Sequence, residues 1–228
     1  MRKSLAIFFS VLMFLFSCKK DRDDVVPNLG YSYAGLDLGS YVIYDVDSHY
    51  YNKPFNVDTV VQFQIKEVVD SKYTDLEGEE AFKIIRYRKE KDSTNWVLQD
   101  VWNAKLTTTN YQKDEENIRF VKLIFPVRTN KSWDGNALNN NDKWEYEYAS
   151  VHQTEKVGVY TLDSVLTVTQ FEDINLIQER FFEEKFAAGI GLVYKNSTDI
   201  TNDFNSTSGL WERDIGDEVI MTLSDYGN

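Results

Sequence analysis

Apolar and polar residues alternate along most of this 228-residue chain from about residue 41 onward. In the run 59–68, for example, Val61, Phe63 and Ile65 fall on one face. A period of two is typical of antiparallel strands that bury one face, and the β-branched and aromatic enrichment of these runs suits a pleated surface. The pattern predicts strands at 41–46, 59–68, 81–88, 96–102, 118–125, 144–148, 165–171, 178–186, 192–195 and 218–223.

Short polar turns join the predicted strands, and no long helical period interrupts them. The run 178–186 also fits a helix, but Gly189 and Gly191 after it indicate a turn or bulge that leads into a partner strand. About ten such strands predict an all-β fold, as an antiparallel half-barrel, a lipocalin-like barrel or a sandwich. Because no stretch rich in proline and glycine divides residues 31–228, we expect a single β domain there.

The first residues have a different pattern, in which Arg2 and Lys3 precede a continuous apolar run from Leu5 to Phe16. This is the pattern of a signal-peptide helix, and the run is too short to cross a bilayer of about 30 Å. The segment 15–18, Leu-Phe-Ser-Cys, resembles the lipobox of bacterial lipoproteins. The resemblance implies cleavage after residue 17 and acylation of Cys18, with palmitate among the chains. Cys18 is the only cysteine, so it has no partner for an intramolecular disulfide.

The charged segment 18–30 after the cleavage site is predicted to be a flexible tether. Its lysines followed by acidic residues resemble the export signal of many Bacteroidota surface lipoproteins, which implies the outer membrane and leaves its periplasmic and outer faces as alternatives. Removal of residues 1–17 leaves 23 basic and 37 acidic residues, a net charge of −14. Such a charge argues against nucleic acid and anionic headgroups as partners, so the expected membrane contact is the lipid on Cys18.

Three further stretches are similar to a group of Bacteroidota outer-membrane lipoproteins. They are the aromatic and glycine-rich box 33–47, the segments 125–126 and 131–136, and the box 186–195, within which Gly-Ile-Gly-Leu-Val-Tyr-Lys at 189–195 is the most specific part. The first box has Ala34-Gly35 where the group commonly has a proline, and Tyr41 where it commonly has a tryptophan. The resemblance implies an envelope location and a β-rich fold, and it implies no reaction.

Catalytic and metal-binding patterns are weak in this sequence. With two histidines, His49 and His152, and one cysteine, the chain has no Cys/His zinc cluster, and no Gly-x-Ser-x-Gly motif is present. Carboxylate pairs such as Glu145 and Glu147 fit a solvated strand face better than a sugar-cleaving site. The oxygen-rich stretch 199–210 lacks the glycine and the final glutamate of a calcium loop. We therefore expect no enzyme, no metal and no cofactor.

Aromatic residues make up 14% of the chain, with five tryptophans, and they are the main compositional hint of a ligand. Two binding modes follow from this composition. In the first, an apolar or lipid-like molecule lies in a β cup lined by inward-facing Phe63, Ile84 and Tyr148. In the second, exposed aromatics, Trp133 first and then Trp211, contact a glycan or a partner protein. The apolar cup is the first expectation, and a purely structural envelope lipoprotein is a further alternative.

Overall fold

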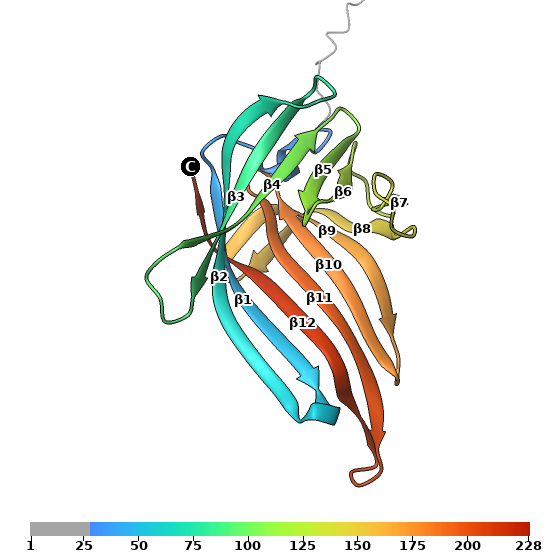
Figure 1. Cartoon of the computed structure of the whole chain (residues 1–228). Coiled ribbons are helices and arrows are strands. Elements are labelled where there is room, and N and C mark those ends of the chain that lie inside the picture. The colour runs from blue at the N-terminus through green and yellow to red at the C-terminus, as the bar shows by residue number, and fades with distance from the viewer. Residues whose placement is uncertain (1–27) are drawn as a thin grey trace, which may run out of the picture.

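A computed structural model describes residues 28–228, which form one twelve-stranded antiparallel sheet that curls into a nearly closed barrel (Figure 1). The predicted signal peptide, Cys18 and most of the tether lie outside the described residues. The strands are β1 (Tyr41–Asn52), β2 (Val57–Thr74), β3 (Glu80–Glu90), β4 (Val97–Leu106), β5 (Asn110–Glu115), β6 (Ile118–Ile124), β7 (Ser132–Asp134), β8 (Glu145–Val157), β9 (Tyr160–Ile174), β10 (Gln178–Ala187), β11 (Gly191–Asn205) and β12 (Leu210–Gly227). Two short 3₁₀ turns, η2 (Tyr31–Ala34) and η3 (Lys53–Phe55), accompany them.

Each strand pairs with its neighbour in sequence except across the β6–β7 connection, and β1 also pairs with β12. The sheet order is therefore β6-β5-β4-β3-β2-β1-β12-β11-β10-β9-β8-β7, which leaves β6 and β7 as the two terminal strands. Hydrogen bonds join these two regions. The Val121 amide donates to the Gly135 carbonyl at 2.9 Å, and Trp133 Nε1 donates to the Val121 carbonyl at 2.8 Å.

Strands β2 and β12 are each 18 residues long, and with β1 and β9–β11 they continue past the closed part as a curved open sheet (Figure 1). The β1–β2 and β11–β12 hairpin tips lie at the lower end of Figure 1, and the described chain begins near the upper end. Gly216 allows close approach within this open sheet. It has a φ of 141°, and a Cβ there would lie 2.0 Å from the Asp199 carbonyl oxygen.

The apolar face of the alternating pattern lies inside the barrel. Its largest cluster gathers residues from η2 and from eight of the strands, with Tyr33, Leu123 and Tyr148 fully buried. The Tyr33 hydroxyl contacts His152 Nδ1 at 2.7 Å and Ser164 Oγ at 2.8 Å, which holds η2 against β8 and β9. Gly35, just after η2, must be glycine because its φ is 60° and a Cβ would lie 2.3 Å from the Ile190 carbonyl oxygen.

The predicted all-β antiparallel fold is confirmed, in the barrel form and not as two separate sheets. Each of the ten predicted strands overlaps a strand of the structure, including 178–186, which is β10. The prediction missed β5 and β7. No helix within residues 28–228 is long and apolar enough to cross a membrane.

Candidate functional site

The cleft that we consider the candidate site opens between the first half of β4 and the β5–β6 hairpin, with a volume of about 580 Å³. This polar cleft is lined by Asp100, Val101, Trp102, Asn103, Asp114, Glu116, Asn117, Ile118, Arg119, Leu138, Asn139, Asn140 and Asn141. Most of these side chains are amides or charged groups. A volume of several hundred Å³ is the usual size of a small-molecule site.

The cleft exists because the first half of β4 does not pair with β5. Pairing of β4 with β5 covers only Asn103–Leu106, so residues 97–102 have β3 alone as a paired neighbour among the described strands. The β5–β6 turn is tight, with φ of 50° at Glu116 and 64° at Asn117, a conformation that asparagine tolerates better than most residues. The space between the departing strand and this turn is the cleft.

Hydrogen bonds fix the outer wall of the cleft. Arg119 Nε donates to Asp114 Oδ1 at 2.9 Å, and this bond raises the pKa of the Arg119 guanidinium. Asn139 Nδ2 donates to the Arg119 carbonyl at 2.8 Å and ties the loop to β6. The side chains of Asn117, Asn140 and Asn141 make no hydrogen bond to other described residues, although the Asn141 backbone amide donates to Asn139. Their amide groups are free for a ligand.

Trp102, which is only 9% exposed, is the most buried aromatic residue that lines the cleft. The Arg86 guanidinium stacks 3.7 Å from the centre of this ring, and Arg86 Nη1 also lies 3.5 Å from Asp100 Oδ2. Arginine on an indole face is a favourable cation–π geometry. The cleft thus shares Asp100 and Trp102 with a network of charged groups inside the barrel.

The first part of this buried network is centred on Glu67. Its carboxylate lies 3.0 Å from Arg86 Nε and accepts a hydrogen bond of 2.8 Å from Lys113 Nζ. Burial alone would raise the pKa of Glu67, but the charges of Lys113 and Arg86 outweigh burial and lower it. All three side chains are at most 10% exposed, so each charge depends on its partners.

The second part of the network is centred on Lys122, which donates to Glu184 Oε1 at 2.6 Å and lies 3.4 Å from Glu115. Lys195 lies 3.7 Å from both of these carboxylates. Burial would lower the pKa of Lys122, but the charges of Glu115 and Glu184 raise it. Burial would likewise raise the pKa of Glu115, and the charges of Lys122 and Lys195 lower it. The barrel interior is therefore both apolar and ionic.

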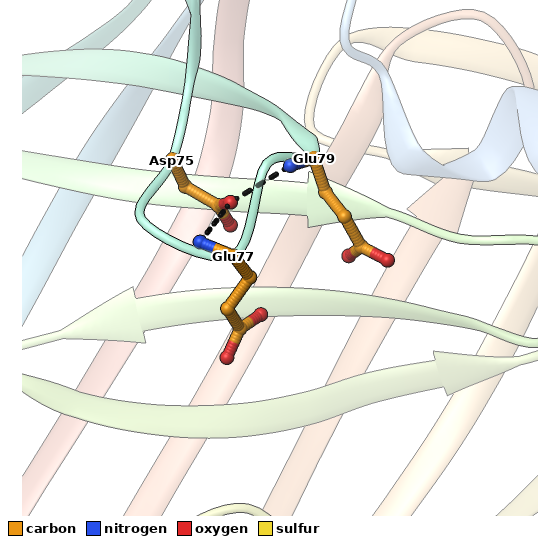
Figure 2. A group of neighbouring side chains, drawn as sticks. All are labelled: Asp75, Glu77 and Glu79. Carbon is orange, nitrogen blue, oxygen red and sulfur yellow. Dashed lines mark hydrogen bonds between the residues drawn. The ribbon is translucent and has the colours of Figure 1, made fainter.

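Asp75, Glu77 and Glu79 bring three carboxylates within 4.8 Å of one another at the β2–β3 turn. Figure 2 shows that the Asp75 carboxylate accepts hydrogen bonds from the backbone amides of Glu77 and Glu79, both at 2.9 Å. The ammonium group of Lys105 lies among them, bonded to Asp75, 2.7 Å from Glu77 and 3.1 Å from Glu79. Because Lys105 already supplies the positive charge, the cluster is an ion-pair group and offers a metal little.

Of the residues expected to bind a ligand, Ile84 and Tyr148 face the barrel interior as expected, but they are packed in the main core. Trp133, expected to be exposed, is half-buried, and this expectation was wrong. Its ring centre lies 4.6 Å from that of Tyr148, and its Nε1 donates a hydrogen bond across the β6–β7 seam. Trp133 therefore helps to close the barrel. Ile84 and Tyr148 are buried in one core cluster, and Trp133 packs against that cluster while partly exposed.

The other two expected ligand-binding residues lie elsewhere. Trp211 is 41% exposed at the β11–β12 tip, where its ring packs 5.8 Å from Phe204. Phe63 is half-buried, lies beneath the guanidinium of Arg88 at 3.6 Å, and lines a hollow of about 440 Å³ beside β2 and β3. The structure therefore does not bring the expected residues into one site.

Sequence analysis missed the buried charges because charged residues on strands usually face water. One signal was present, since alternation in 59–68 places Glu67 on the same face as Phe63 and Ile65. The polar cleft had no such signal, because it depends on how far β4 and β5 stay paired.

Comparisons with protein-family models, with curated proteins and with solved structures find no match to this chain.

Proposed function

We propose that this protein is an outer-membrane lipoprotein, anchored through Cys18, that binds a neutral, hydroxyl-rich saccharide in the polar cleft and does not catalyse a reaction. The observation that supports binding is the cleft itself, about 580 Å³ and lined mainly by amides and charged groups. The sequence led us to expect glycan binding by exposed Trp133 and Trp211, and neither residue lines this cleft, so the proposal keeps the ligand class and changes the site.

The amide groups suit hydroxyl ligands. Each asparagine side chain offers both a donor and an acceptor, as does each sugar hydroxyl. Asn117, Asn140 and Asn141 are exposed at the cleft and free of hydrogen bonds from their side chains to the described residues. Exposed Val101 and Leu138 add apolar contacts for the carbon faces of a sugar ring.

The charges of the cleft select against anions. Asp100, Asp114 and Glu116 contribute three carboxylates, whereas Arg119 is the one cation that lines the cleft. A sulfated, phosphorylated or uronic-acid ligand would meet net negative charge there, which disfavours binding. We therefore expect neutral saccharides or amino sugars.

The same carboxylates support a binding role without catalysis. Glycoside hydrolysis normally needs two carboxyl groups free to act on one bond. In this cleft Asp114 is bonded to Arg119 and Asp100 faces Arg86, so only Glu116 has no cationic partner in the described residues. Both histidines lie outside the cleft lining.

An apolar guest in the β cup finds less support, although it stays a prediction. The space next to Ile84, Tyr44 and Tyr111 inside the barrel is about 30 Å³. That volume fits a water molecule and no lipid.

Two experiments test the proposal. Intact-mass analysis of the protein from a bacterial envelope should show the acyl chains, and Cys18→Ser should abolish them; an unmodified mature mass would refute the anchor. For binding, the soluble mature chain (residues 18–228, Cys18→Ser) is applied to a glycan array beside the same chain with Asn140→Leu. We expect neutral glycans to bind the chain that retains Asn140 and not to bind the Asn140→Leu variant. Absence of binding in both, or equal binding in both, would refute the cleft as the site.

A further inference from the structure

Strands β8 and β9 separate at one end, and a second hollow lies at this fork. Their pairing begins at Glu147 opposite Thr169, whereas residues 171–174 of β9 pair with β10 alone among the described strands. The hollow has a volume of about 580 Å³, which is within the usual range for a small-molecule site. We call it the β8–β9 hollow. It shares no lining residue with the polar cleft.

Gln170 lines the β8–β9 hollow and is an extra residue on its strand. Phe182 of β10 lies opposite Phe171 and Glu183 lies opposite Thr169, so a bulge leaves Gln170 without a partner on β10. Gln170 is only 5% exposed, yet its side-chain amide makes no hydrogen bond to other described residues and is not fully enclosed. Buried amides normally have a hydrogen-bond partner, and bulges often orient a side chain toward a functional site. Gln170 therefore presents a donor and an acceptor to a ligand in this hollow.

The aromatic part of the lining is the indole of Trp144. Its ring centre lies 5.0 Å from that of Phe182 and 6.1 Å from that of Tyr146, both in edge-to-face packing. These contacts hold the indole in place, while Trp144 as a whole is only half-buried. Tryptophan is the aromatic residue that attracts cations most strongly.

The charged groups of the lining are mostly negative. Lys143 donates a hydrogen bond of 2.7 Å to Glu145, so these two charges offset each other. Glu147 and Glu172 are exposed, and neither makes an ion pair with another described residue. With three carboxylates against one ammonium group, the net charge of the lining is −2.

A further carboxyl group lies beside the hollow. Glu183 pairs with Thr169, which is part of the lining. Burial raises the pKa of Glu183, and the charges of Glu155 and Glu172 raise it further, against the opposite effect of Lys185. This direction agrees with an excess of negative charge on this side of the sheet.

The cations nearest to the hollow have other partners. Lys185 donates to Glu155 at 2.6 Å, and Arg180 lies 3.3 Å from Asp199. Arg180 also lies over the ring of Phe171, but it does not line the hollow. Lys131, which precedes the β7 partner of Glu147, donates to two backbone carbonyls. The two free carboxylates of the lining therefore keep their charge available for a ligand.

A metal ion fits these carboxylates poorly. Among the described residues, the group that brings three possible ligand atoms within 4.8 Å of one another is at Asp75, Glu77 and Glu79, and no such group occurs in the β8–β9 hollow. A calcium or magnesium ion needs its oxygen ligands close around one point. Separated carboxylates suit a larger cation that has separate charges.

We propose that the β8–β9 hollow binds an aliphatic diamine or polyamine. Each ammonium group has three N–H donors and no acceptor, which matches the carboxylates of Glu147 and Glu172 and the amide oxygen of Gln170. Two unpaired carboxylates match two positive charges. The hydrocarbon chain between the amines would contact the indole of Trp144. This site is independent of the proposed saccharide site.

A ¹H–¹⁵N NMR titration of the soluble mature chain with cadaverine tests the inference. We expect the side-chain amide of Gln170 and the indole N–H of Trp144 to shift first, and pentanediol, which has hydroxyl groups in place of both amines, to leave them unchanged. The double variant Glu147→Gln, Glu172→Gln should raise the half-saturation concentration at least tenfold. Both residues are exposed, so the fold should tolerate the change.

Two control variants separate this site from other effects. Asp45→Asn with Asp47→Asn removes two exposed carboxylates from β1 and should change the half-saturation concentration less than twofold. Asn140→Leu should leave cadaverine binding unchanged, so failure of the saccharide proposal and failure of this inference give different results.

Four results would overturn the inference. Absence of shifts at Gln170 and Trp144 with millimolar cadaverine would show that the hollow binds no diamine, and equal shifts with pentanediol would show that charge has no part in binding. An equal loss in the Asp45 and Asp47 variant would show general attraction to an acidic protein. The same shifts with magnesium alone would show a metal site in place of an amine site.

Discussion

Replacement of Lys122 by methionine is the sharpest test of the buried network. Methionine has a similar length and no charge, so the change removes the cation that bonds to Glu184 at 2.6 Å and leaves the shape nearly intact. Glu184 is 1% exposed, and its nearest remaining cation is Lys195 at 3.7 Å. The variant must either bury an uncompensated carboxylate or neutralise it.

The cost follows from that choice. Removal of one partner of a buried ion pair typically destabilises a protein by about 3–5 kcal/mol. A glutamate in water has a pKa of about 4.3, so binding a proton at pH 7 costs about 3.5 kcal/mol and at pH 5 about 1 kcal/mol. We therefore expect Lys122→Met to lower the free energy of unfolding by about 3 kcal/mol at pH 7 and by about 1 kcal/mol at pH 5.

Urea unfolding followed by tryptophan fluorescence measures both values, with the slope m checked for constancy. Lys143→Met is the matched control, because Lys143 pairs with Glu145 at 2.7 Å while both side chains are more than half exposed, and it should leave the midpoint unchanged. The double variant Lys122→Met, Glu184→Gln should recover most of the loss. A loss below about 1 kcal/mol at pH 7, or an equal loss at both pH values, would refute the role given to this network.

The remaining predictions concern pH, ligand and metal. The pKa values of Glu67 and Glu115 are lowered in the folded protein, so these two carboxylates stabilise the fold above pH 4.5 and lose that effect as the pH falls below it. The urea midpoint of unfolding should therefore decrease from pH 7 to pH 4 and again to pH 3. A midpoint that rises along this series would contradict the prediction. Arg119→Ala should weaken saccharide binding at least tenfold in calorimetry, whereas Lys143→Ala should not. Lys105→Met should let 1 mM calcium raise the melting temperature, while the wild type should not respond; a wild-type response would show that the acidic turn binds the ion.

The fold was predictable where inward positions are apolar. Runs such as 59–68 and 165–171 alternate cleanly, and both lie within strands of the structure. Strand β5 was missed because its inward residues include Lys113 and Glu115, so the apolar period fails there. Strand β7 has three residues, too few for any period, and its position depends on hydrogen bonds across the seam.

The candidate site was less predictable, for a geometric reason. Trp133 lies in an oxygen-rich loop, which suggested exposure, but the barrel closes by packing that ring against Tyr146 and Tyr148. The cleft combines β4, the β5–β6 turn and the loop at 138–141, and their meeting depends on the three-dimensional path of the chain. A single sequence contains the residue types of such a site without showing which of them meet.

The measurement that tests the central claim most directly is a ¹H–¹⁵N NMR titration of the soluble mature chain with neutral saccharides from the array. The account predicts that the first signals to shift are the side-chain amides of Asn117, Asn140 and Asn141 and the backbone of 100–103, with half-saturation that Asn140→Leu raises at least tenfold. Shifts confined to the open sheet around Trp211, or to the barrel interior around Ile84, would contradict a saccharide site in the polar cleft.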